Sequence, residues 1–367
     1  MSFESSAQPI KLGYLSDMTF APGFPREDLF KAMRLVFEDA LRDGLIDRPV
    51  EIVYREVEGL PKGSIKAVLD AFAELVDEGC LAVIGPSISD NAPPVRAAIE
   101  ERFRVPALSM CGLEEWLGPW TFSLPLGSMS DEPRAWARLV AKGGGRTVGV
   151  VIEQSLIGET YLRNFRAACR AEGLRILAEE AIPQVAQDVG EAIGRIHAAR
   201  PDAIVHCGFG LGILHVNPAL RALDWDPPRY TGTAWQMAFA TPALWQGLEG
   251  WVGIDLYDEG NPVGQAFLDR YEVAHGIRPS SYSPLARRDL ATILVHAFAD
   301  AHPLSPQGVR DALERVKLLP AACGAGGTRI SFGNWMHRGW VGNRFLVARR
   351  LDADGRTHHL VDNAIFD

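Results

Sequence analysis

The stretch LAVIGPSISDN, Leu81–Asn91, decides the fold class of this chain. Its four apolar residues, Leu81–Ile84, predict a buried strand, and the glycine, proline and serines that follow predict a loop. A helix is expected next, over Ala92–Arg102, and Val105–Ser109 predicts another strand. Continuously apolar strands separated by helices indicate a parallel sheet with both faces covered.

The same alternation continues in both directions from this stretch. Helices are predicted where apolar residues recur every three or four positions, as at Leu29, Met33, Phe37 and Leu41, or where a capping residue such as Ser64 precedes them. Further strands are expected over Ile10–Ser16, Val50–Tyr54, Thr147–Ile152, Leu174–Glu179, Ala203–Cys207, Arg229–Thr233, Trp251–Leu256, Arg329–Phe332, Phe345–Arg350 and His358–Val361. Helices are expected from about Glu27 to Gly44, from Ser64 to Gly79, and over Tyr161–Ala171, Val189–Ala199, Ile213–Leu223, Pro262–His275 and Tyr282–Ala301.

The length of the chain predicts two domains. Its 367 residues exceed the size at which one hydrophobic core stops growing, and 47% apolar with 23% charged residues is ordinary for a globular protein. The fold class is therefore α/β, with two doubly wound parallel-sheet lobes. Such sheets bind ligands beyond the carboxyl ends of their strands, so the expected site is the crevice between the lobes.

Several classes of protein are disfavoured by composition and by missing motifs. The net charge is −9 and no long Lys/Arg run occurs, so we expect no nucleic-acid partner. No stretch approaches the ~20 apolar residues of a membrane helix, so we expect no membrane insertion. The five cysteines are widely spaced and are expected to be free, buried thiols.

The chain carries no motif of a common enzyme class. Neither a G-x-x-x-x-G-K-[ST] phosphate loop, an H-E-x-x-H zinc motif nor a G-x-S-x-G nucleophile elbow occurs. The GFGLG run at Gly208–Gly212 lacks the third glycine of a dinucleotide-binding loop, because Ile213 occupies that place. We therefore expect no cofactor, no metal and no enzymatic activity, with a doubly wound transferase as the less favoured alternative.

The order of these segments resembles type I periplasmic binding proteins, and specifically the branch that serves branched-chain amino-acid ABC transporters. That branch also includes a cytoplasmic amide sensor. The resemblance runs from Ile10 to about Arg350 and depends on the order and spacing of short pieces rather than on one motif. The pieces are IKLGYLSD at strand one, Gly79–Asp90, RVPALSMCG at Arg104–Gly112, Thr147–Tyr161, RPDAIVHCGFG at Arg200–Gly210, Arg278–Ala291 and GTRISFG at Gly327–Gly333.

The resemblance implies a three-segment hinge. The chain should cross between lobes near Pro125, Leu256 and Phe332. Lobe 1 is then expected to comprise residues 1–125 and 257–331, and lobe 2 residues 126–256 and 332–367.

The resemblance also implies a set of ligand-binding residues. In lobe 1 the loop after Leu81–Ile84 should offer hydroxyls and backbone N–H groups to a ligand carboxylate, and the loop after Val105–Ser109 should act in the same way. Capping of the following helix is the alternative role for the two serines of the first loop. The lobe 1 residues are Ser87, Ser89, Ser109, Met110, Cys111 and Gly112, and those expected from lobe 2 are Gln154, Ile157, Phe209, Thr233, Trp235 and Gln236. Trp235 has core packing as its alternative.

The loop Gly232–Gln236 departs from the pattern of amino-acid binders. They tend to carry an acid there to pair with the ligand ammonium, whereas this loop reads GTAWQ. Since a buried ammonium without a counter-charge is costly, a free α-amino acid is disfavoured. Five aromatic residues at the expected cleft end favour a ring-bearing ligand. They are Phe20, Phe24, Trp116, Trp235 and Tyr282. Arg288 would suit a planar carboxylate, with an ordinary surface arginine as the alternative.

The sequence thus predicts a solute-binding protein that closes its two lobes around a small organic ligand. The ligand is expected to be a carboxylate or amide with an apolar or aromatic body, or an amino-acid-like compound. Delivery to an ABC permease and control of a regulatory partner are both open, as are a monomer and a dimer. The N-terminus shows no basic and apolar signal region, which favours a cytoplasmic sensor, while the resemblance favours a periplasmic importer component.

Overall fold

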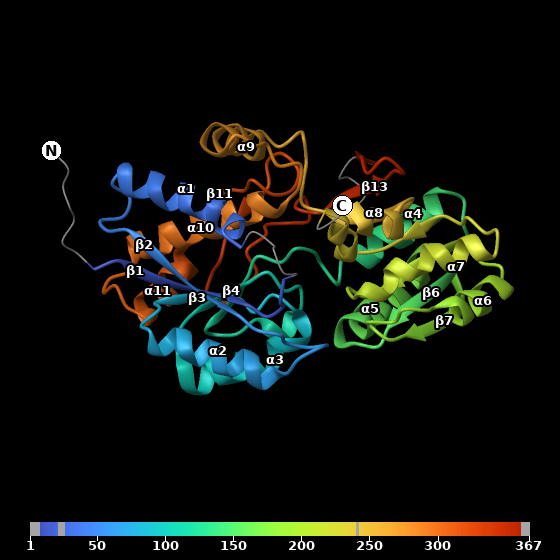
Figure 1. Ribbon diagram of the computed structural model, residues 1–367, viewed down its shortest axis with the longest axis horizontal. Helices are drawn as coiled ribbons and strands as arrows, with labels where there is room; N and C mark the ends of the chain where they lie inside the picture. The colour runs from blue at the N-terminus through green and yellow to red at the C-terminus, as the bar shows by residue number, and fades with distance from the viewer. Residues whose placement is uncertain (1–7, 21–25, 240–241, 361–367) are drawn as a thin grey trace. The chain divides into compact units, whose positions relative to one another are not determined.

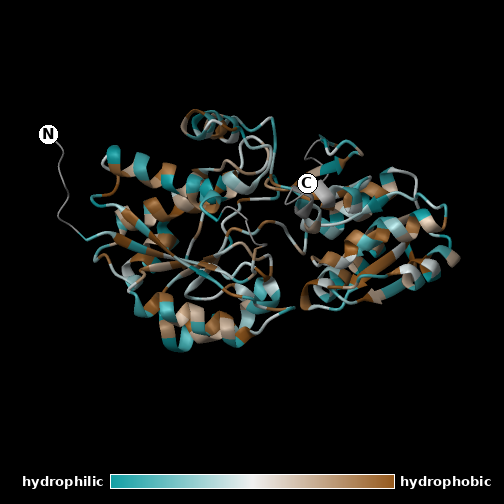
Figure 2. Cartoon of the chain, in the orientation of Figure 1, coloured by the Kyte–Doolittle hydropathy of each residue, from teal (hydrophilic) through white to brown (hydrophobic). Residues whose placement is uncertain are grey.

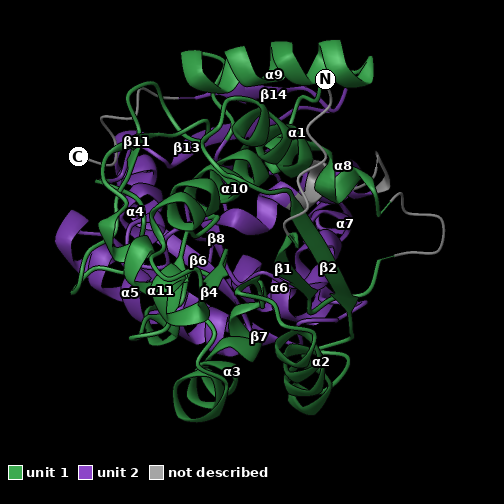
Figure 3. Ribbon diagram, turned by 90° about the vertical axis from the view of Figure 1, so that its left-hand side faces the viewer, with its two compact units in different colours: residues 1–126, 257–342 green, residues 127–256, 343–367 purple. Residues whose placement is uncertain are grey.

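The chain folds into two units, each with its own β-sheet (Figure 3). The computed structural model describes residues 8–20, 26–239 and 242–360. Unit 1 comprises residues 1–126 and 257–342, and unit 2 comprises residues 127–256 and 343–367. The chain therefore passes from one unit to the other at three places.

The third crossing lies between Gly342 and Asn343, later than the expected position near Phe332. The segment between these positions belongs to unit 1 because it hydrogen-bonds there. Trp340 bridges to Ile330, and its indole Nε1 donates to the Pro125 carbonyl at 2.8 Å. The N–H of Ser123 donates to the His337 carbonyl at 2.8 Å.

Unit 1 has a five-stranded parallel sheet in the order β2-β1-β3-β4-β5. Its inner strand β1 is buried along nearly its whole length, as expected for a strand covered on both faces. A separate antiparallel pair, β11 with β12, lies outside this sheet. The strands are β1 (Ile10–Ser16), β2 (Val50–Glu56), β3 (Ala82–Ile84), β4 (Ala107–Ser109), β5 (Thr121–Ser123), β11 (Leu319–Pro320) and β12 (Arg329–Ile330).

Helices cover both faces of this sheet, with α2 and α3 on one side and α1 and α10 on the other (Figure 1). The core under α2 and α3 joins their apolar faces to residues of the strands, such as Phe72 against Val83. The helices are α1 (Asp28–Arg42), α2 (Ile65–Asp77), α3 (Ala92–Ala98, continued by a wider turn over Ile99–Phe103), α9 (Pro262–His275), α10 (Ser283–Asp300) and α11 (Pro306–Arg315).

Unit 2 has a seven-stranded sheet in the order β14-β13-β10-β9-β8-β6-β7. Its first five strands along the chain are parallel, and β13 and β14 add an antiparallel edge. Strand β8 is buried at all positions, whereas the edge strand β7 alternates between exposed and half-buried positions up to its buried last residue, Ile182. The strands are β6 (Thr147–Glu153), β7 (Arg175–Ile182), β8 (Ala203–Cys207), β9 (Arg229–Tyr230), β10 (Trp251–Asp255), β13 (Val347–Leu351) and β14 (Thr357–His359).

The helices of unit 2 show the amphipathic colouring expected of covering helices, while its inner strands are hydrophobic (Figure 2). One core cluster joins α6, α7 and α8 to strands β6, β8 and β10 through residues such as Ile196, Leu220 and Trp251. The helices are α4 (Glu132–Lys142), α5 (Leu156–Glu172), α6 (Gly190–Ala198), α7 (Val216–Ala222) and α8 (Pro242–Leu248), with short 3-10 turns over Leu211–His215 and Thr233–Phe239.

Both sheets share one winding order. Counted along the chain within each unit, the parallel strands run 2-1-3-4-5, which places the reversal between the first and third strands. The reversal lies between β1 and β3 in unit 1 and between β6 and β8 in unit 2. The predicted α/β class with doubly wound parallel sheets is confirmed.

Two further sequence expectations can be compared with the described part of the chain. All five cysteines are free and buried, as expected. Within residues 8–20, 26–239 and 242–360, no helix has the length and apolar character needed to cross a membrane.

Candidate functional site

Each unit carries one candidate ligand-binding edge, which comprises the carboxyl ends of its parallel strands and the loops that follow them. In a doubly wound sheet the loops on either side of the strand-order reversal diverge and leave room for a ligand beyond the carboxyl ends of the strands. These are the loops that follow β1 and β3 in unit 1, and β6 and β8 in unit 2. At both edges the structure places a buried carboxyl group that the sequence analysis did not single out.

In unit 1 this group is Asp17, which directly follows β1 and is 1% exposed. Its carboxylate accepts hydrogen bonds from the backbone N–H of Ser87 at 2.8 Å and of Ile88 at 3.0 Å. The Asn91 side-chain amide donates a third bond at 2.8 Å, and Asn91 in turn accepts from the Leu60 N–H at 2.9 Å. Burial raises the pKa of Asp17, although these hydrogen bonds lower it. Asp17 thus fixes the loop after β3 to the end of β1.

The bonds to Asp17 correct one expectation for the loop after β3. The N–H group of Ser87 was expected to be offered to a ligand carboxylate, but it is already bound to the protein's own carboxylate. Ser89 is buried, so within this loop the half-buried residues are Ser87 and Ile88.

The loop after β4 is also held by internal hydrogen bonds. The fully buried Ser109 hydroxyl donates to the Pro86 carbonyl and accepts from the Cys111 N–H at 2.9 Å. Burial raises the pKa of the Cys111 thiol to about 12, so it is protonated at neutral pH. Ser109 and Cys111 therefore shape this edge from beneath.

Four other predicted residues of unit 1 are half-buried and keep surface for a ligand. Phe20 lies beyond Asp17 and its N–H donates to Glu56 at 3.2 Å. Tyr282 is the residue before α10. These four residues are Phe20, Met110, Gly112 and Tyr282. Phe24 lies outside the described residues.

In unit 2 the corresponding group is Glu153, the last residue of β6, which is fully buried. Its carboxylate accepts the backbone N–H groups of Phe209, at 2.7 Å, and of Gly210, both in the loop after β8. A side chain at position 208 could not be accommodated, because its Cβ would lie 2.3 Å from the Glu153 carboxyl carbon. The GFG sequence therefore belongs to a loop that wraps an internal carboxylate, as Ser87 and Ile88 do in unit 1.

A buried histidine completes this cluster. His206 Nε2 lies 3.1 Å from Glu153 Oε1, and Nδ1 lies 3.0 Å from the Thr231 hydroxyl. The geometry fits the tautomer in which Nε2–H donates to the carboxylate and Nδ1 accepts from Thr231. Strands β6, β8 and the end of β9 are thereby linked side by side beneath the loop that carries Phe209.

Unit 2 holds a second buried acid, Glu132, at the start of α4. It accepts from the Tyr161 hydroxyl at 2.8 Å and from the Ser128 N–H at 2.6 Å. A Cβ at Gly232 would lie 2.2 Å from Glu132 Oε2, so the loop after β9 needs a glycine to pass this carboxyl group. Burial raises the pKa of Glu132 to about 8, against the hydrogen bonds from Tyr161, Ser128 and Thr233 that lower it. At neutral pH this carboxyl group is mainly neutral.

The predicted residues of unit 2 occupy three different environments. Gln154 is exposed and Phe209 is half-buried, so both present surface at the edge. Ile157, Thr233 and Gln236 were expected to contact the ligand, but all three are buried. Trp235 is fully buried in the core, where its Nε1 donates to the Trp251 carbonyl at 3.2 Å. Its environment is that of the alternative role, core packing.

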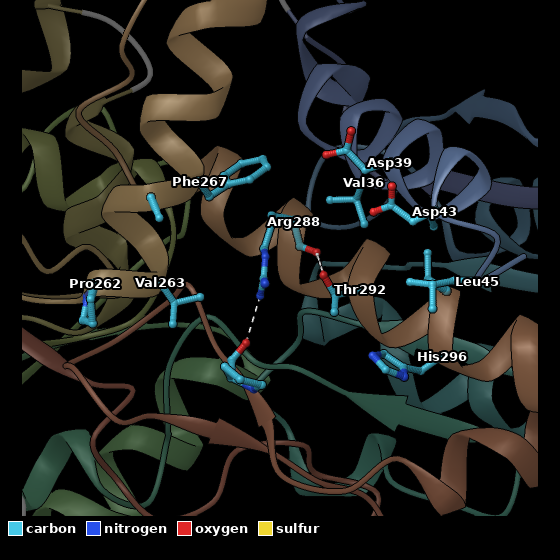
Figure 4. Close-up of a pocket in the computed structure, with 14 residues that line it drawn as sticks. Val36, Asp39, Asp43, Leu45, Pro262, Val263, Phe267, Arg288, Thr292 and His296 are labelled. Carbon is cyan, nitrogen blue, oxygen red and sulfur yellow. Dashed lines mark hydrogen bonds between the residues drawn. The ribbon is translucent and has the colours of Figure 1, made fainter.

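Arg288 lies at a different place from the one expected. It lines a groove within unit 1 formed by α1, α9 and α10, together with residues such as Val36 and Pro320 (Figure 4). The residues of α1 in this groove come from its second half, and α1 begins at the carboxyl ends of the strands. The groove therefore lies towards the opposite, amino end of the sheet.

Among residues 8–20, 26–239 and 242–360, no group of three or more histidine, cysteine or acidic side chains is arranged to hold a metal ion. The side chains that keep surface at the edges are polar, as in Ser87 and Gln154, or apolar, as in Met110 and Phe209. Their chemistry suits recognition of a small polar or amphipathic molecule.

Comparison with known proteins gives one family. The sequence profile of the family described as periplasmic binding protein matches residues 9–343. Among curated proteins, no sequence matches the chain.

Solved structures of this family are similar over nearly the whole chain. A periplasmic binding protein type 1 from Bordetella pertussis Tohama I is 19% identical with a TM-score of 0.80, covering 96% of this chain and 100% of that one. A leucine-binding protein from Thermotoga maritima MSB8 is 16% identical with a TM-score of 0.79, covering 96% and 98%. The branched-chain amino-acid transporter substrate-binding protein LivJ from Streptococcus pneumoniae, solved with isoleucine, is 17% identical with a TM-score of 0.77, covering 96% and 98%. At these identities the similarity establishes the fold.

Proposed function

Because the chain belongs to the periplasmic binding protein family, we propose that it captures a small organic ligand by closing its two units around it and delivers that ligand to an ABC-type importer. The observation that carries the proposal is the pair of internally clamped edges. Asp17 and Glu153 each fix the loop after the neighbouring strand at a strand-order reversal. Loops fixed before the ligand arrives lose little conformational entropy on binding.

The three crossings between the units support closure as the binding step. Their short connections at 126/127, 256/257 and 342/343 can absorb a rotation of one unit against the other. A ligand that contacts both edges binds the closed state better than the open state and shifts the population towards it.

We propose a carboxylate or amide with an apolar or aromatic body as the ligand. The similar structures include a leucine-binding protein and LivJ solved with isoleucine, so amino-acid-like compounds are the second ligand class. Glu132 argues for the first class. It is the acid beside the loop after β9, and its raised pKa leaves it mainly neutral at pH 7, so it supplies little counter-charge for an ammonium group.

The residues proposed to contact the ligand are those that keep surface at the two edges. Unit 1 contributes Ser87, Met110, Gly112, Phe20 and Tyr282, and unit 2 contributes Gln154 and Phe209. Phe209 is the most informative of these, because its N–H is fixed by Glu153 while its half-buried ring is not part of that clamp.

Isothermal titration calorimetry tests the proposal with phenylacetate, phenylacetamide, leucine and isoleucine as titrants. We expect binding of an aromatic acid or amide, and weaker binding in Phe209→Ala with the exposed neighbour Leu211→Ala as the matched control. Tight binding of leucine or isoleucine with no response to the aromatic compounds would overturn the ligand class. A regulatory role in place of transport would appear as ligand-dependent binding to a partner other than a permease.

A further inference from the structure

The groove that contains Arg288 has the features of a second ligand site, separate from the two edges. It has a volume of about 660 Å³ and lies wholly within unit 1. Ligand pockets in proteins typically span ~300–1,000 Å³. Figure 4 shows Arg288, Thr292 and His296 along α10, with Phe267 and Val263 on α9 and Val36 on α1 around them.

The groove exists because α9 is attached to the rest of unit 1 at both of its ends. At its start, the Asn261 side-chain amide binds the carbonyls of residues 321–324 at 2.9–3.3 Å. Near its other end, Tyr271 packs against Ala32 and Leu35 of α1, and Arg270 pairs with Asp39 at 2.9 Å. The first two turns of α9 therefore bridge over α10 and leave space beneath them.

Arg288 supplies a cation with free donors in this space. Its side chain is 19% exposed, so most of it is removed from water. Nη1 donates to Asp289 at 2.8 Å and to the Pro320 carbonyl at 2.9 Å. Nε and Nη2 donate no hydrogen bond to any described residue, and this edge of a guanidinium group matches the two oxygens of a carboxylate.

Asp289 only partly neutralises the positive charge of Arg288. Its carboxylate also accepts the backbone N–H groups of Ala322, at 2.9 Å, and Cys323, at 2.9 Å. These bonds commit Asp289 to holding the 321–324 segment. A carboxylate ligand would complete the hydrogen bonding of Arg288 from the other side.

The remaining groups of the groove limit the ligand to one charge. Val36, Val263 and Phe267 form apolar walls beside Arg288. Asp39 and Asp43 lie on the α1 side. Burial would raise the pKa of Asp39, but the hydrogen bonds from Arg270 and Arg42 lower it, so Asp39 is ionised and repels a second carboxylate. Burial and the nearby Arg288 lower the pKa of His296, which is neutral at pH 7.

We propose that this groove binds a small monocarboxylate with an apolar tail, independently of the site at the two edges. The carboxylate pairs with Nε and Nη2 of Arg288, and the tail lies against Val36, Val263 and Phe267. Bound there, the ligand ties α9 to α10 and so braces the first turns of α9, next to the crossing at 256/257.

Methyl-detected NMR with hexanoate as the probe tests the proposal. Hexanoate should shift the methyl signals of Val36, Val263 and Val295 in a saturable way. Arg288→Gln should weaken this binding by about tenfold or more, as expected for a lost charge-assisted pair. Arg287→Gln is the matched control on the same helix turn, because Arg287 bonds to Ser283 and does not line the groove. Hexanamide should bind more weakly than hexanoate because it carries no charge. Adipate should also bind more weakly than hexanoate, because Asp39 repels its second carboxylate.

A second variant guards against a folding defect in Arg288→Gln. Ala266 is exposed and lines the groove, so Ala266→Trp should fill the groove without disturbing the core, and should abolish the hexanoate shifts at an unchanged melting temperature. Phe209→Ala in unit 2 should leave these shifts unchanged, which separates the groove from the proposed function. Hexanoate shifts confined to unit 2, shifts that persist in Ala266→Trp, or equal affinity in Arg288→Gln and the wild type would each overturn the proposal.

Discussion

The two units fix the loops at the carboxyl ends of their strands in a similar way but with different residues. In each sheet a buried acid, directly after the first strand in unit 1 and at its last residue in unit 2, binds two successive N–H groups of the loop after the neighbouring strand. In unit 1 the third partner is an amide, Asn91, while in unit 2 it is a histidine, His206. Unit 2 also carries Glu132 beside the loop after β9. Each loop is therefore positioned by hydrogen bonds within its own unit.

The largest effect is expected from breaking the clamp of unit 2. Glu153→Ala leaves the buried N–H groups of Phe209 and Gly210 and the His206 ring without their acceptor, so it should lower the free energy of unfolding by about 4 kcal/mol. Urea denaturation measures the change. Glu159→Ala, at an exposed position on α5, is the control and should change stability by less than about 0.5 kcal/mol. A loss below about 1 kcal/mol in Glu153→Ala would show that the clamp is not needed.

The second prediction concerns the acid that distinguishes unit 2. The pKa of Glu132 is about 8 in the folded protein and 4.5 in its ordinary state, so the folded protein holds a proton that the unfolded chain releases between these values. Its contribution to stability is fully present below about pH 4.5 and is lost as the pH rises through 8.

Glu132→Gln removes this dependence. Relative to the variant, the wild type should lose on the order of 4 kcal/mol between pH 5 and pH 8, at about 1.4 kcal/mol for each pH unit. Urea denaturation at each pH checks the slope, with Glu159→Gln as a control that should run parallel to the wild type. A difference between wild type and Glu132→Gln that stays constant with pH would contradict the assignment.

The clamp of unit 1 should be the weaker of the two. Asp17→Asn retains one oxygen acceptor but turns an amide towards the N–H groups of Ser87 and Ile88, and we expect a loss of about 2 kcal/mol. Urea denaturation measures the loss, and Asp47→Asn, at a surface position, is the control for the effect of an Asp-to-Asn change on the free energy of unfolding. If Asp17→Asn cost more than Glu153→Ala, the ranking of the two edges would be reversed.

The smallest effect compares two matched helix caps. Ser64 accepts from the Ala67 N–H at 3.2 Å in unit 1, and Ser155 accepts from the Gly158 N–H at 3.0 Å in unit 2. Replacement of either serine by alanine should cost about 1 kcal/mol in unfolding experiments. Ser155 follows the proposed contact Gln154, so Ser155→Ala should also weaken ligand binding in calorimetry, whereas Ser64→Ala should not. Equal effects of Ser64→Ala and Ser155→Ala on ligand binding would show that the Ser155 cap does not position the ligand site.

Most elements could be predicted from the sequence because their signals are local. Strands Ile10–Ser16 and Ala203–Cys207 and helix Pro262–His275 have the predicted bounds, since apolar runs and a proline after Asn261 mark them. The Ser64 cap is confirmed as well. Helices α4 and α11 were not predicted, although proline stands in the first turn of each.

The candidate site was harder to predict because its key contacts join distant residues. Asp17 reaches Ser87 across 70 positions, and Glu153 reaches Phe209 across 56. From sequence alone an acid at the end of a strand indicates only the start of a loop. One sequence feature could have identified these two acids. Both Asp17 and Glu153 stand at the end of the first strand of their unit. Trp235 was ambiguous for a related reason, since an aromatic residue after a strand fits a core and a ligand site equally well.

Native mass spectrometry of the freshly purified protein tests the central claim most directly. We predict the mass of the chain plus a small organic molecule, released on denaturation, or acquired on incubation with phenylacetate, phenylacetamide, leucine or isoleucine. A bare chain that acquires none of these compounds would contradict the account of two fixed edges that close on a ligand.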